Sequence, residues 1–254
     1  MTDQTQYLTT PQGRRIAHVQ VPGAGPGVVF LGGFKSDMQG TKAIHLQAWA
    51  ERTGRAFLRL DYSGHGQSSG AFTDGCIGDW AEDAQAVISE LTTGPQVLVG
   101  SSMGGWISLL TARAMTPRIA GLVTIAAAPD FTEDSMWAGF DSTQRAGLQN
   151  EGQIALPSEY GEPYIITQKL IEDGRAHLVL RQPLQLAFPV RFLQGTADLD
   201  VDKSVALRLL EHATGPDMRL TLVDGADHRF SDVDCLALIE TAVEDVIARS
   251  ERNT

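Results

Sequence analysis

The stretch QVLVGSSMGGWISLL, at residues 96–110, constrains the fold of this chain more than any other. An apolar run leads into a patch of very small residues, and a second apolar run follows directly. The first run is typical of a buried strand and the second of a buried helix, so the small residues mark a sharp turn between them. Strand–turn–helix units of this kind build parallel sheets that are covered by helices.

The rest of the chain repeats this alternation of short β-rich segments and longer segments of helical period. The pattern predicts an α/β fold, with a mostly parallel twisted sheet and helices on both of its faces. Helices are expected between the strands, as in residues 78–91, where the apolar side chains fall on one helical face. The expected strands are residues 15–21, 27–31, 56–60, 96–99, 121–125, 190–194 and 218–223.

Residues 131–188 break this alternation. They contain prolines, short amphipathic pieces and no clear sheet strand, and their scattered aromatic residues are Trp137, Phe140, Tyr160 and Tyr164. Connections of this length in compact domains usually have a function. We therefore expect a small helical cap, inserted between the two parts of the core, residues 1–130 and 189–254. A long connection without a role in binding is the alternative.

Composition and charge exclude several classes of protein. The 254 residues are 43% hydrophobic, which fits one domain, and the net charge of −11 with no basic stripe argues against nucleic acid as a partner. Apolar runs are too short to span a bilayer, and residues 1–10 lack the basic and apolar regions of a signal peptide. Cys76 and Cys235 are too few for a disulfide framework and lack metal-ligand spacing. A cytoplasmic location without a membrane span or bound metal is the expectation.

The turn within residues 96–110 carries the pattern G-x-S-x-G, which is typical of a nucleophilic serine exposed at the top of a strand. Neighbouring segments crowd the positions two before and two after such a serine, and both favour glycine. If the turn is centred on Ser102, these two positions are Gly100 and Gly104. If it is centred on Ser101, they are the bulky residues Val99 and Met103. Ser102 is therefore the candidate nucleophile. A small-residue helix entry with only a packing role is the alternative.

A serine hydroxyl needs a base to take its proton, and that base is usually a histidine held by a carboxylate. In sites of this type the chain order is serine, acid, histidine. His177 follows Ser102 within the insertion, and His212 lies late in an expected helix. His228 lies in a short loop after the last expected strand, at the sheet edge where the serine turn is expected. His228 is the candidate base, with capping of the final helix as the alternative.

The acid is expected in the loop that follows the strand at residues 190–194. This loop reads GTADLDVD and offers Asp198, Asp200 and Asp202. Asp198 is favoured because it follows the glycine turn most closely and leaves Val201 to anchor the loop. Asp200 is the second choice. Loop aspartates are most often simply solvated, so the assignment of the acid depends on its position relative to His228.

The transition state of acyl transfer needs two N–H donors for the oxyanion. One is expected from Met103, which follows the serine, and the other from Phe34, which follows the glycine pair at residues 32–33 after an early strand. An ordinary strand-ending turn would explain those glycines equally well. His65, in the glycine-rich loop SGHGQSSG, precedes the serine and is interpreted as a structural loop histidine.

Several of these stretches together resemble one family. With GGFKSDMQGTKA, RLDYSGHGQSSG, QVLVGSSMGGW and DGADHRF, the chain resembles the α/β-hydrolases over nearly its whole length, and within them the subgroup of palmitoyl-protein thioesterases and acyl-glucuronide esterases. The resemblance implies a serine hydrolase with a triad of Ser102, Asp198 and His228. Two departures from the family are noted. No organelle presequence is expected from residues 1–10, and Asp202 stands where the acid loop of the family often has proline.

The expected activity is cleavage of carboxylic esters or thioesters through an acyl-enzyme, without a cofactor. The substrate is expected to be a small molecule or an acylated protein, and a depalmitoylase-like thioesterase fits the resemblance. A hydrolase of carbon–carbon bonds or lactones on the same fold is the alternative within enzymes. A non-catalytic ligand receptor on a hydrolase scaffold is the alternative of another class.

Overall fold

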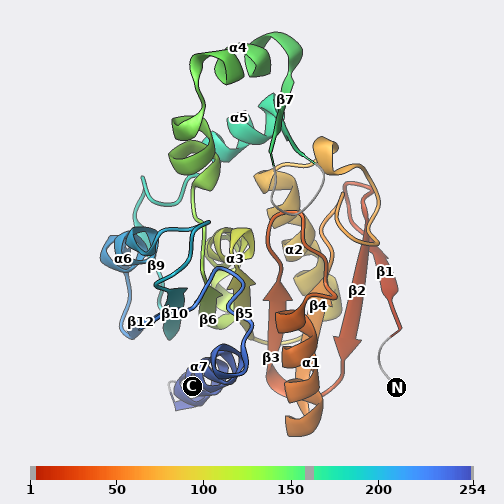
Figure 1. Cartoon of the computed structure of the whole chain (residues 1–254). Helices are drawn as coiled ribbons and strands as arrows, with labels where there is room; N and C mark the ends of the chain where they lie inside the picture. The colour runs from red at the N-terminus through yellow and green to blue at the C-terminus, as the bar shows by residue number, and fades with distance from the viewer. Residues whose placement is uncertain (1–3, 158–162, 253–254) are drawn as a thin grey trace.

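A single eight-stranded sheet runs through the middle of the computed structural model, which describes residues 4–157 and 163–252 (Figure 1). Its strand order is β1-β2-β4-β3-β5-β6-β10-β12. Strand β2 pairs antiparallel with β1 and with β4, and the other pairings in this sheet are parallel. The strands are β1 Gln6–Thr9, β2 Arg15–Val21, β3 Ala24–Leu31, β4 Arg55–Leu60, β5 Gln96–Ser101, β6 Ile119–Ile125, β10 Val190–Gly195 and β12 Met218–Val223.

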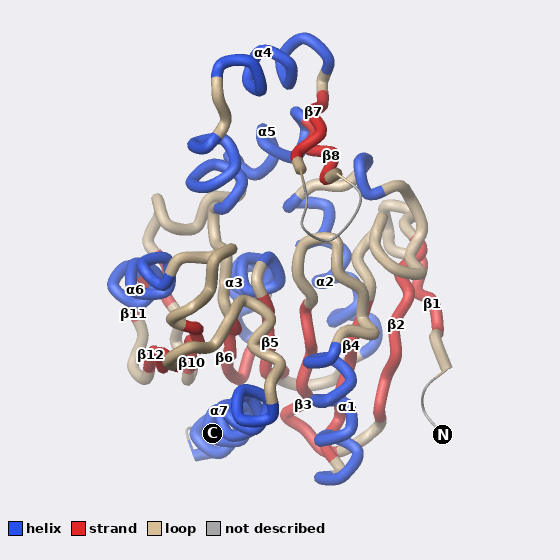
Figure 2. The backbone as a smooth tube through the Cα atoms, viewed as in Figure 1, coloured by secondary structure: helices blue, strands red, loops and turns tan. Residues whose placement is uncertain are grey.

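Helices cover both faces of this sheet (Figure 2). Helices α1 (Thr41–Thr53) and α7 (Val233–Arg252) bury their apolar side chains on one face, and α2 (Ile77–Leu91), α3 (Met103–Ala114) and α6 (Lys203–His212) on the other. Successive side chains of the central strand β5 point to opposite faces of the sheet and so belong to different halves of the core. Val97 and Val99 pack on the side of α1 and α7, and Leu98 packs on the side of α2 and α3. The predicted α/β fold is confirmed.

All seven predicted strands are present, and two of them, β2 and β12, have the predicted bounds. The edge strand β1 was not predicted, because it has only four residues and its side chains are largely exposed. Short segments without a buried face give little period-2 signal. Single turns of 3₁₀-helix at Phe72–Asp74 and Thr116–Arg118 complete the connections within the core.

Residues 131–157 and 163–176 of the insertion lie beyond the carboxyl ends of the parallel strands (Figures 1 and 2). The insertion contains helices α4 (Ser142–Glu151) and α5 (Gln168–Ala176), preceded by a π-helical turn at Thr132–Trp137. The expectation of no strands here was wrong, since β7 (Gln153–Leu156) and β8 (Tyr164–Thr167) form an antiparallel pair. Each has four residues, of which only Ile166 is buried, too few to register as a pattern. Tyr160 lies outside the described residues.

Asp130, just before the insertion begins, joins its start to residues 179–181 in its last part. Its carboxylate is fully buried and accepts hydrogen bonds from the backbone N–H groups of Val179 and Leu180, at 2.7 and 3.0 Å. The Arg181 guanidinium adds an ion pair at 2.6 Å. Asp130 has a φ of 58°, a conformation that is strained for a residue other than glycine. One side chain, that of Asp130, therefore closes the stem of the insertion, which we define as Asp130 with residues 179–181.

A further short pairing joins β9 (Leu184–Gln185) to β11 (Ala213–Thr214), after the stem in the chain.

Within the described residues, no helix has the length and apolar character needed to cross a lipid bilayer. Cys76 and Cys235 are both buried and free. Burial raises the pKa of each thiol to about 12, so neither side chain is a thiolate at neutral pH.

Candidate active site

Ser102 stands at a strained turn between β5 and α3. Its φ of 55° and ψ of −119° are unusual for a residue other than glycine, and conformations of this kind cost about 1–3 kcal/mol. Three backbone hydrogen bonds hold it in place. Its N–H donates to the Ile125 carbonyl at 2.9 Å, and its carbonyl accepts from the N–H groups of Gly105 and Ala128 at 2.9 and 3.1 Å. The strand that neighbours β5 thus fixes the direction in which the serine points.

Close packing explains the glycines two residues before and after Ser102. A Cβ atom on Gly100 would lie 2.3 Å from the carbonyl oxygen of Gly104. A Cβ atom on Gly104 would lie 2.0 Å from the carbonyl oxygen of Leu31. Real Cβ atoms do not approach backbone oxygen this closely, so neither position has room for a side chain. The structure therefore has the predicted crowding at both glycines, two residues before and two residues after Ser102.

A continuous hydrogen-bonded chain links Ser102 to a histidine and a carboxylate. The Oγ atom of Ser102 lies 3.1 Å from Nε2 of His228, and Nδ1 of His228 lies 2.9 Å from Oδ2 of Asp198. Ser102 follows β5, Asp198 lies in the loop after β10, and His228 lies in the loop after β12. These strands are parallel, so their carboxyl ends lie at one edge of the sheet and bring together groups up to 126 residues apart.

Asp198, rather than Asp200, holds His228. The Asp198 carboxylate is completely buried, and its second oxygen accepts the backbone N–H groups of Asp200 and Val201 at 2.9 and 2.8 Å. Gln194 adds a side-chain hydrogen bond at 2.9 Å. Burial alone would raise the pKa of Asp198, but hydrogen bonds from His228 and Val201 outweigh it and the net shift is downward. The group therefore stays ionised beside the imidazole. Asp200 is exposed.

The other two histidines that follow Ser102 bind elsewhere. His177 ends helix α5 of the insertion and pairs with Asp173, which raises the pKa of this imidazole. His212 ends α6, and its Nε2 atom lies 2.8 Å from the Gln182 carbonyl. Asp202, the third acid of its loop, caps α6 through the N–H of Ser204. Each of these side chains has a local structural task.

Two backbone N–H groups beside Ser102 have no acceptor among the described residues. They belong to Met103, the first residue of α3, and to Phe34, in the loop after β3. This loop passes close to the serine, since a Cβ atom on Gly33 would lie 3.3 Å from the Cβ atom of Ser102. Both residues line the same cavity as Ser102. This is the arrangement expected of donors to an oxyanion.

Ser102 and His228 open into a cavity of about 790 Å³. One wall comes from the insertion and is mostly apolar, with Phe131, Met136 and Tyr164. The rest of the rim is formed by loops of the core and by helices α1 and α6. It is rich in charged residues, which include Lys35, Asp37, Lys42, Asp200, Asp202, Arg208 and Arg229. A cavity of this size accommodates a drug-sized ligand.

Lys42 was not singled out in the sequence, because a single lysine at a helix start carries no recognisable pattern. Its Nζ atom donates a short hydrogen bond to the carbonyl of Arg229, the residue after His228. Burial lowers the pKa of Lys42 to about 8, although the nearby Asp227 favours the charged form. Lys42 thus connects α1 to the loop that carries the histidine.

Asp198, Asp200 and His228 are the one group of potential metal ligands found among the described residues, with donor atoms within 4.8 Å of one another. The imidazole and the Asp198 carboxylate are already hydrogen-bonded to each other. A metal ion in this position would have to displace that bond.

A mostly parallel sheet covered on both faces, with a strained serine after β5 and an acid and a histidine in later loops, defines an α/β-hydrolase. Residues 29–158 match the family model described as the alpha/beta hydrolase fold. The chain belongs to this family.

Similar proteins extend this comparison to nearly the whole chain. The palmitoyl-protein thioesterase ABHD10 of Rattus norvegicus, a mitochondrial protein, is 30% identical over 95% of this chain and 82% of its own length. The structure of alpha/beta hydrolase domain-containing protein 10 from mouse has a TM-score of 0.89 and 29% identity, over 96% of this chain and 98% of that one. A crystal structure from Agrobacterium vitis S4 has a TM-score of 0.92 and 41% identity, with the same coverage.

Proposed function

We propose that this protein is a serine hydrolase that cleaves esters or thioesters through a covalent acyl-enzyme. The observation that carries the proposal is the hydrogen-bonded chain from Ser102 through His228 to the buried Asp198, at a strained turn that opens into a cavity. Ser102 is the nucleophile, His228 the general base and Asp198 the group that fixes the imidazole tautomer. The N–H groups of Phe34 and Met103 form the oxyanion hole.

The reaction proceeds in two halves. Nε2 of His228 takes the hydroxyl proton while Oγ of Ser102 attacks the substrate carbonyl, and the negative oxygen that forms accepts the two N–H groups. As the tetrahedral intermediate collapses, the leaving alcohol or thiol takes the proton from His228. Water then attacks the acyl-enzyme with His228 again as the base, which releases the carboxylic acid and restores Ser102. Asp198 stabilises the imidazolium in both halves.

The substrate class follows from the cavity and from the relatives. The mammalian relatives are named palmitoyl-protein thioesterases, and their 30–31% identity over 95% of this chain supports a thioester substrate. The apolar wall of Phe131, Met136 and Tyr164 supports an apolar acyl group on the side of the insertion. We propose accordingly that residues 131–188 act as a cap, and that the charged rim faces the leaving group.

The test is a series of matched oxygen esters and thioesters from acetyl to palmitoyl, with kcat/KM measured for the wild type and for Ser102→Ala. We expect kcat/KM to rise toward long acyl thioesters, and Ser102→Ala to lose several orders of magnitude while keeping its fold. A preference for short oxygen esters would keep the mechanism and overturn the thioesterase assignment. Turnover that persists in Ser102→Ala would overturn the nucleophile. If no substrate of the series is turned over, the esterase and thioesterase assignment is wrong, and a carbon–carbon hydrolase or a ligand receptor replaces it.

A further inference from the structure

The oxyanion loop after β3 contains a turn that its own sequence does not favour. The Ser36 N–H donates to the Gly33 carbonyl at 3.2 Å, which closes a β-turn with Phe34 and Lys35 at its two central positions. Lys35 has a φ of 55°. A positive φ at the second central position normally requires glycine or asparagine, so a lysine there is strained. Some contact outside the turn must hold this conformation.

The Lys35 side chain lies over the rings of Phe72 and Tyr164, and His65 binds the backbone of the turn itself. The backbone N–H of Lys35 donates to Nε2 of His65 at 3.2 Å. The other ring nitrogen, Nδ1, lies 3.2 Å from the carbonyl oxygen of Ser63. A carbonyl only accepts hydrogen bonds, so Nδ1 carries the proton and Nε2 is the acceptor for Lys35. The bond to the loop thus requires the neutral imidazole in this single tautomer.

The surroundings of His65 hold the imidazole in that state. The side chain is 4% exposed, and its ring lies against those of Tyr62, Phe72 and Trp80 with centroids 5.0–5.6 Å apart. Burial lowers the pKa of His65 to about 4, and the nearby positive charge of Lys35 acts in the same direction, against the hydrogen bond to Ser63. The imidazole is therefore neutral across the physiological range.

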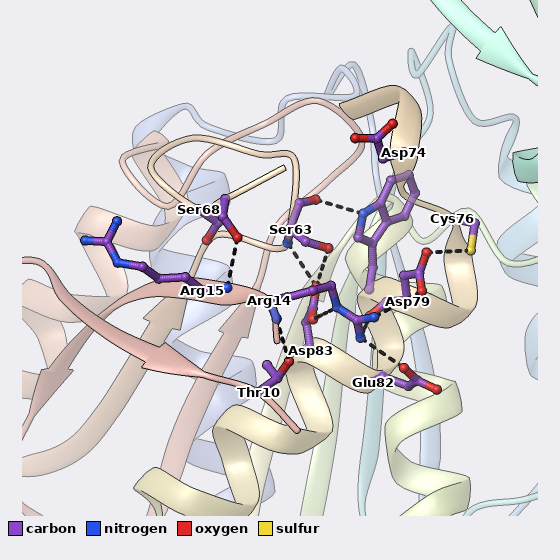
Figure 3. Close-up of polar contacts among 12 residues, drawn as sticks. Thr10, Arg14, Arg15, Ser63, Ser68, Asp74, Cys76, Asp79, Glu82 and Asp83 are labelled. Carbon is purple, nitrogen blue, oxygen red and sulfur yellow. Dashed lines mark hydrogen bonds and ion pairs between the residues drawn. The ribbon is translucent and has the colours of Figure 1, made fainter. Parts of the chain in front are cut away.

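The Ser63 carbonyl that orients His65 is itself fixed by a buried network (Figure 3). The Trp80 indole N–H donates to the same carbonyl at 3.0 Å. The N–H and hydroxyl of Ser63 both donate to the Asp83 carboxylate, at 2.9 and 2.7 Å. Asp83 is fully buried and paired with Arg14 at 2.6 Å. None of these groups touches the cavity, so the network has no direct contact with a substrate.

We propose that His65 is a positioning residue for catalysis, which holds the Phe34 N–H beside Ser102 through its hydrogen bond to the next residue, Lys35. The Phe34 N–H shares a peptide plane with the Gly33 carbonyl, and the Gly33–Ser36 turn sets the direction of that plane. The proposal rests on the assignment of Phe34 to the oxyanion hole. His65 acts on the transition state through this donor, and Ser102, His228 and Asp198 are independent of it.

The test uses two substitutions that each keep one half of the imidazole's hydrogen bonding. Asparagine places an amide nitrogen near the position of Nδ1, so His65→Asn keeps the donor to Ser63 and loses the acceptor for Lys35. Glutamine places an amide oxygen near the position of Nε2, so His65→Gln keeps the acceptor. The full chain is used, with one ester or thioester that the wild type cleaves, and urea unfolding of both variants establishes that they are folded.

We expect His65→Asn to lower kcat at least ten-fold with KM within about two-fold, because the oxyanion exists only in the transition state. Loss of one whole oxyanion donor costs about 10²–10³ in kcat, which bounds the effect. His65→Gln should return to within about three-fold of the wild type, and the acid limb of the kcat/KM profile should not move in either variant.

Failure of the serine mechanism and failure of the role proposed for His65 give different results. If Ser102→Ala is as active as the wild type, the serine mechanism is wrong and the role of His65 falls with it. If the wild type depends on Ser102 but His65→Asn has the kcat of the wild type, His65 does not position the donor. Equal losses in His65→Asn and His65→Gln, or a shifted acid limb, would mean that the ring only fills space or supports His228, and would overturn the proposal alone.

Discussion

At the scale of single residues, the three side chains of the proposed triad differ in how far the sequence determines them. Ser102 could be chosen over Ser101 because only one centring of the turn puts glycine at both crowded positions. His228 followed from chain order and from its place after the last strand. The choice between Asp198 and Asp200 depends on which carboxylate is buried and receives backbone N–H groups. That is a property of the folded loop, and no spacing rule gives it.

Substitution of the two aspartates tests this distinction. We expect Asp198→Asn to lower kcat by about 10³–10⁴-fold, because the amide no longer fixes the productive imidazole tautomer or stabilises the imidazolium. Asp200→Asn is the matched control in the same loop. Its kcat should stay within a few-fold of that of the wild type, since Asp200 is exposed in the cavity rim and Asp198 is the carboxylate that binds His228. Steady-state kinetics on one substrate measure kcat for both variants. A larger loss of kcat in Asp200→Asn than in Asp198→Asn would make Asp200 the triad acid.

The buried His65 also makes stability depend on pH. Its pKa is lowered to about 4 in the folded protein, from 6.5 for a free imidazole, so the unfolded chain takes up the proton first as the pH falls. The contribution to stability is complete above pH 6.5 and declines toward pH 4. Between pH 7.5 and pH 5 the free energy of unfolding should fall by about 2 kcal/mol more in the wild type than in His65→Gln. Urea unfolding at the two pH values measures this, and equal slopes would show that His65 titrates normally.

At the scale of elements, the strand–turn–helix unit around Ser102 is determined by close backbone packing. Its apolar runs and small residues were visible in the sequence, as were all seven predicted strands. Edge strand β1 and the β7–β8 pair were not, because strands of four residues with at most one buried side chain carry no period that distinguishes them from a loop. The contact between His65 and Lys35 also escaped prediction, since it joins two loops that are 30 residues apart.

The packing argument predicts unequal effects of two similar substitutions. In Gly104→Ala, the new Cβ atom would lie 2.0 Å from the Leu31 carbonyl oxygen, and α3 must shift away from β3. We expect a loss of about 3 kcal/mol in the free energy of unfolding, the upper end of the usual cost of overpacking, because the clash is with backbone. Gly139→Ala is the control, because a Cβ atom there meets nothing within 4 Å, and its effect should stay within about 0.5 kcal/mol. Comparable urea midpoints for the two variants would contradict this account.

At the scale of the whole molecule, core and insertion meet around the ring of Phe34. This ring makes edge-to-face contacts with Phe72 and Trp80 of the core and with Phe131 and Tyr164 of the insertion, at centroid distances of 4.9–6.1 Å. The residue proposed to donate to the oxyanion thus also contacts the wall proposed to receive the acyl group. The sequence predicted that a covering segment exists, but the aromatic contacts depend on tertiary structure.

Removal of the Tyr164 ring should therefore change selectivity more than chemistry. An aromatic pair contributes about 1 kcal/mol, so Tyr164→Ala should lower the ratio of kcat/KM for long over short acyl chains about five-fold. Turnover of an acetyl ester should change little. Tyr7→Ala, an exposed tyrosine on the edge strand, is the control. An unchanged ratio in Tyr164→Ala would remove the insertion from acyl recognition.

The closed stem of the insertion has a consequence for how such a protein diverges. Asp130 binds the backbone at Val179 and Leu180, so the chain leaves and re-enters the core at one fixed point. We expect changes in length or sequence between these residues to leave Ser102, before the stem, at its distance from Asp198 and His228, after it, provided that the contacts of Phe131 and Tyr164 with Phe34 are kept. Mutation can therefore explore new substrates in one stretch of the gene while selection preserves the reaction in the rest.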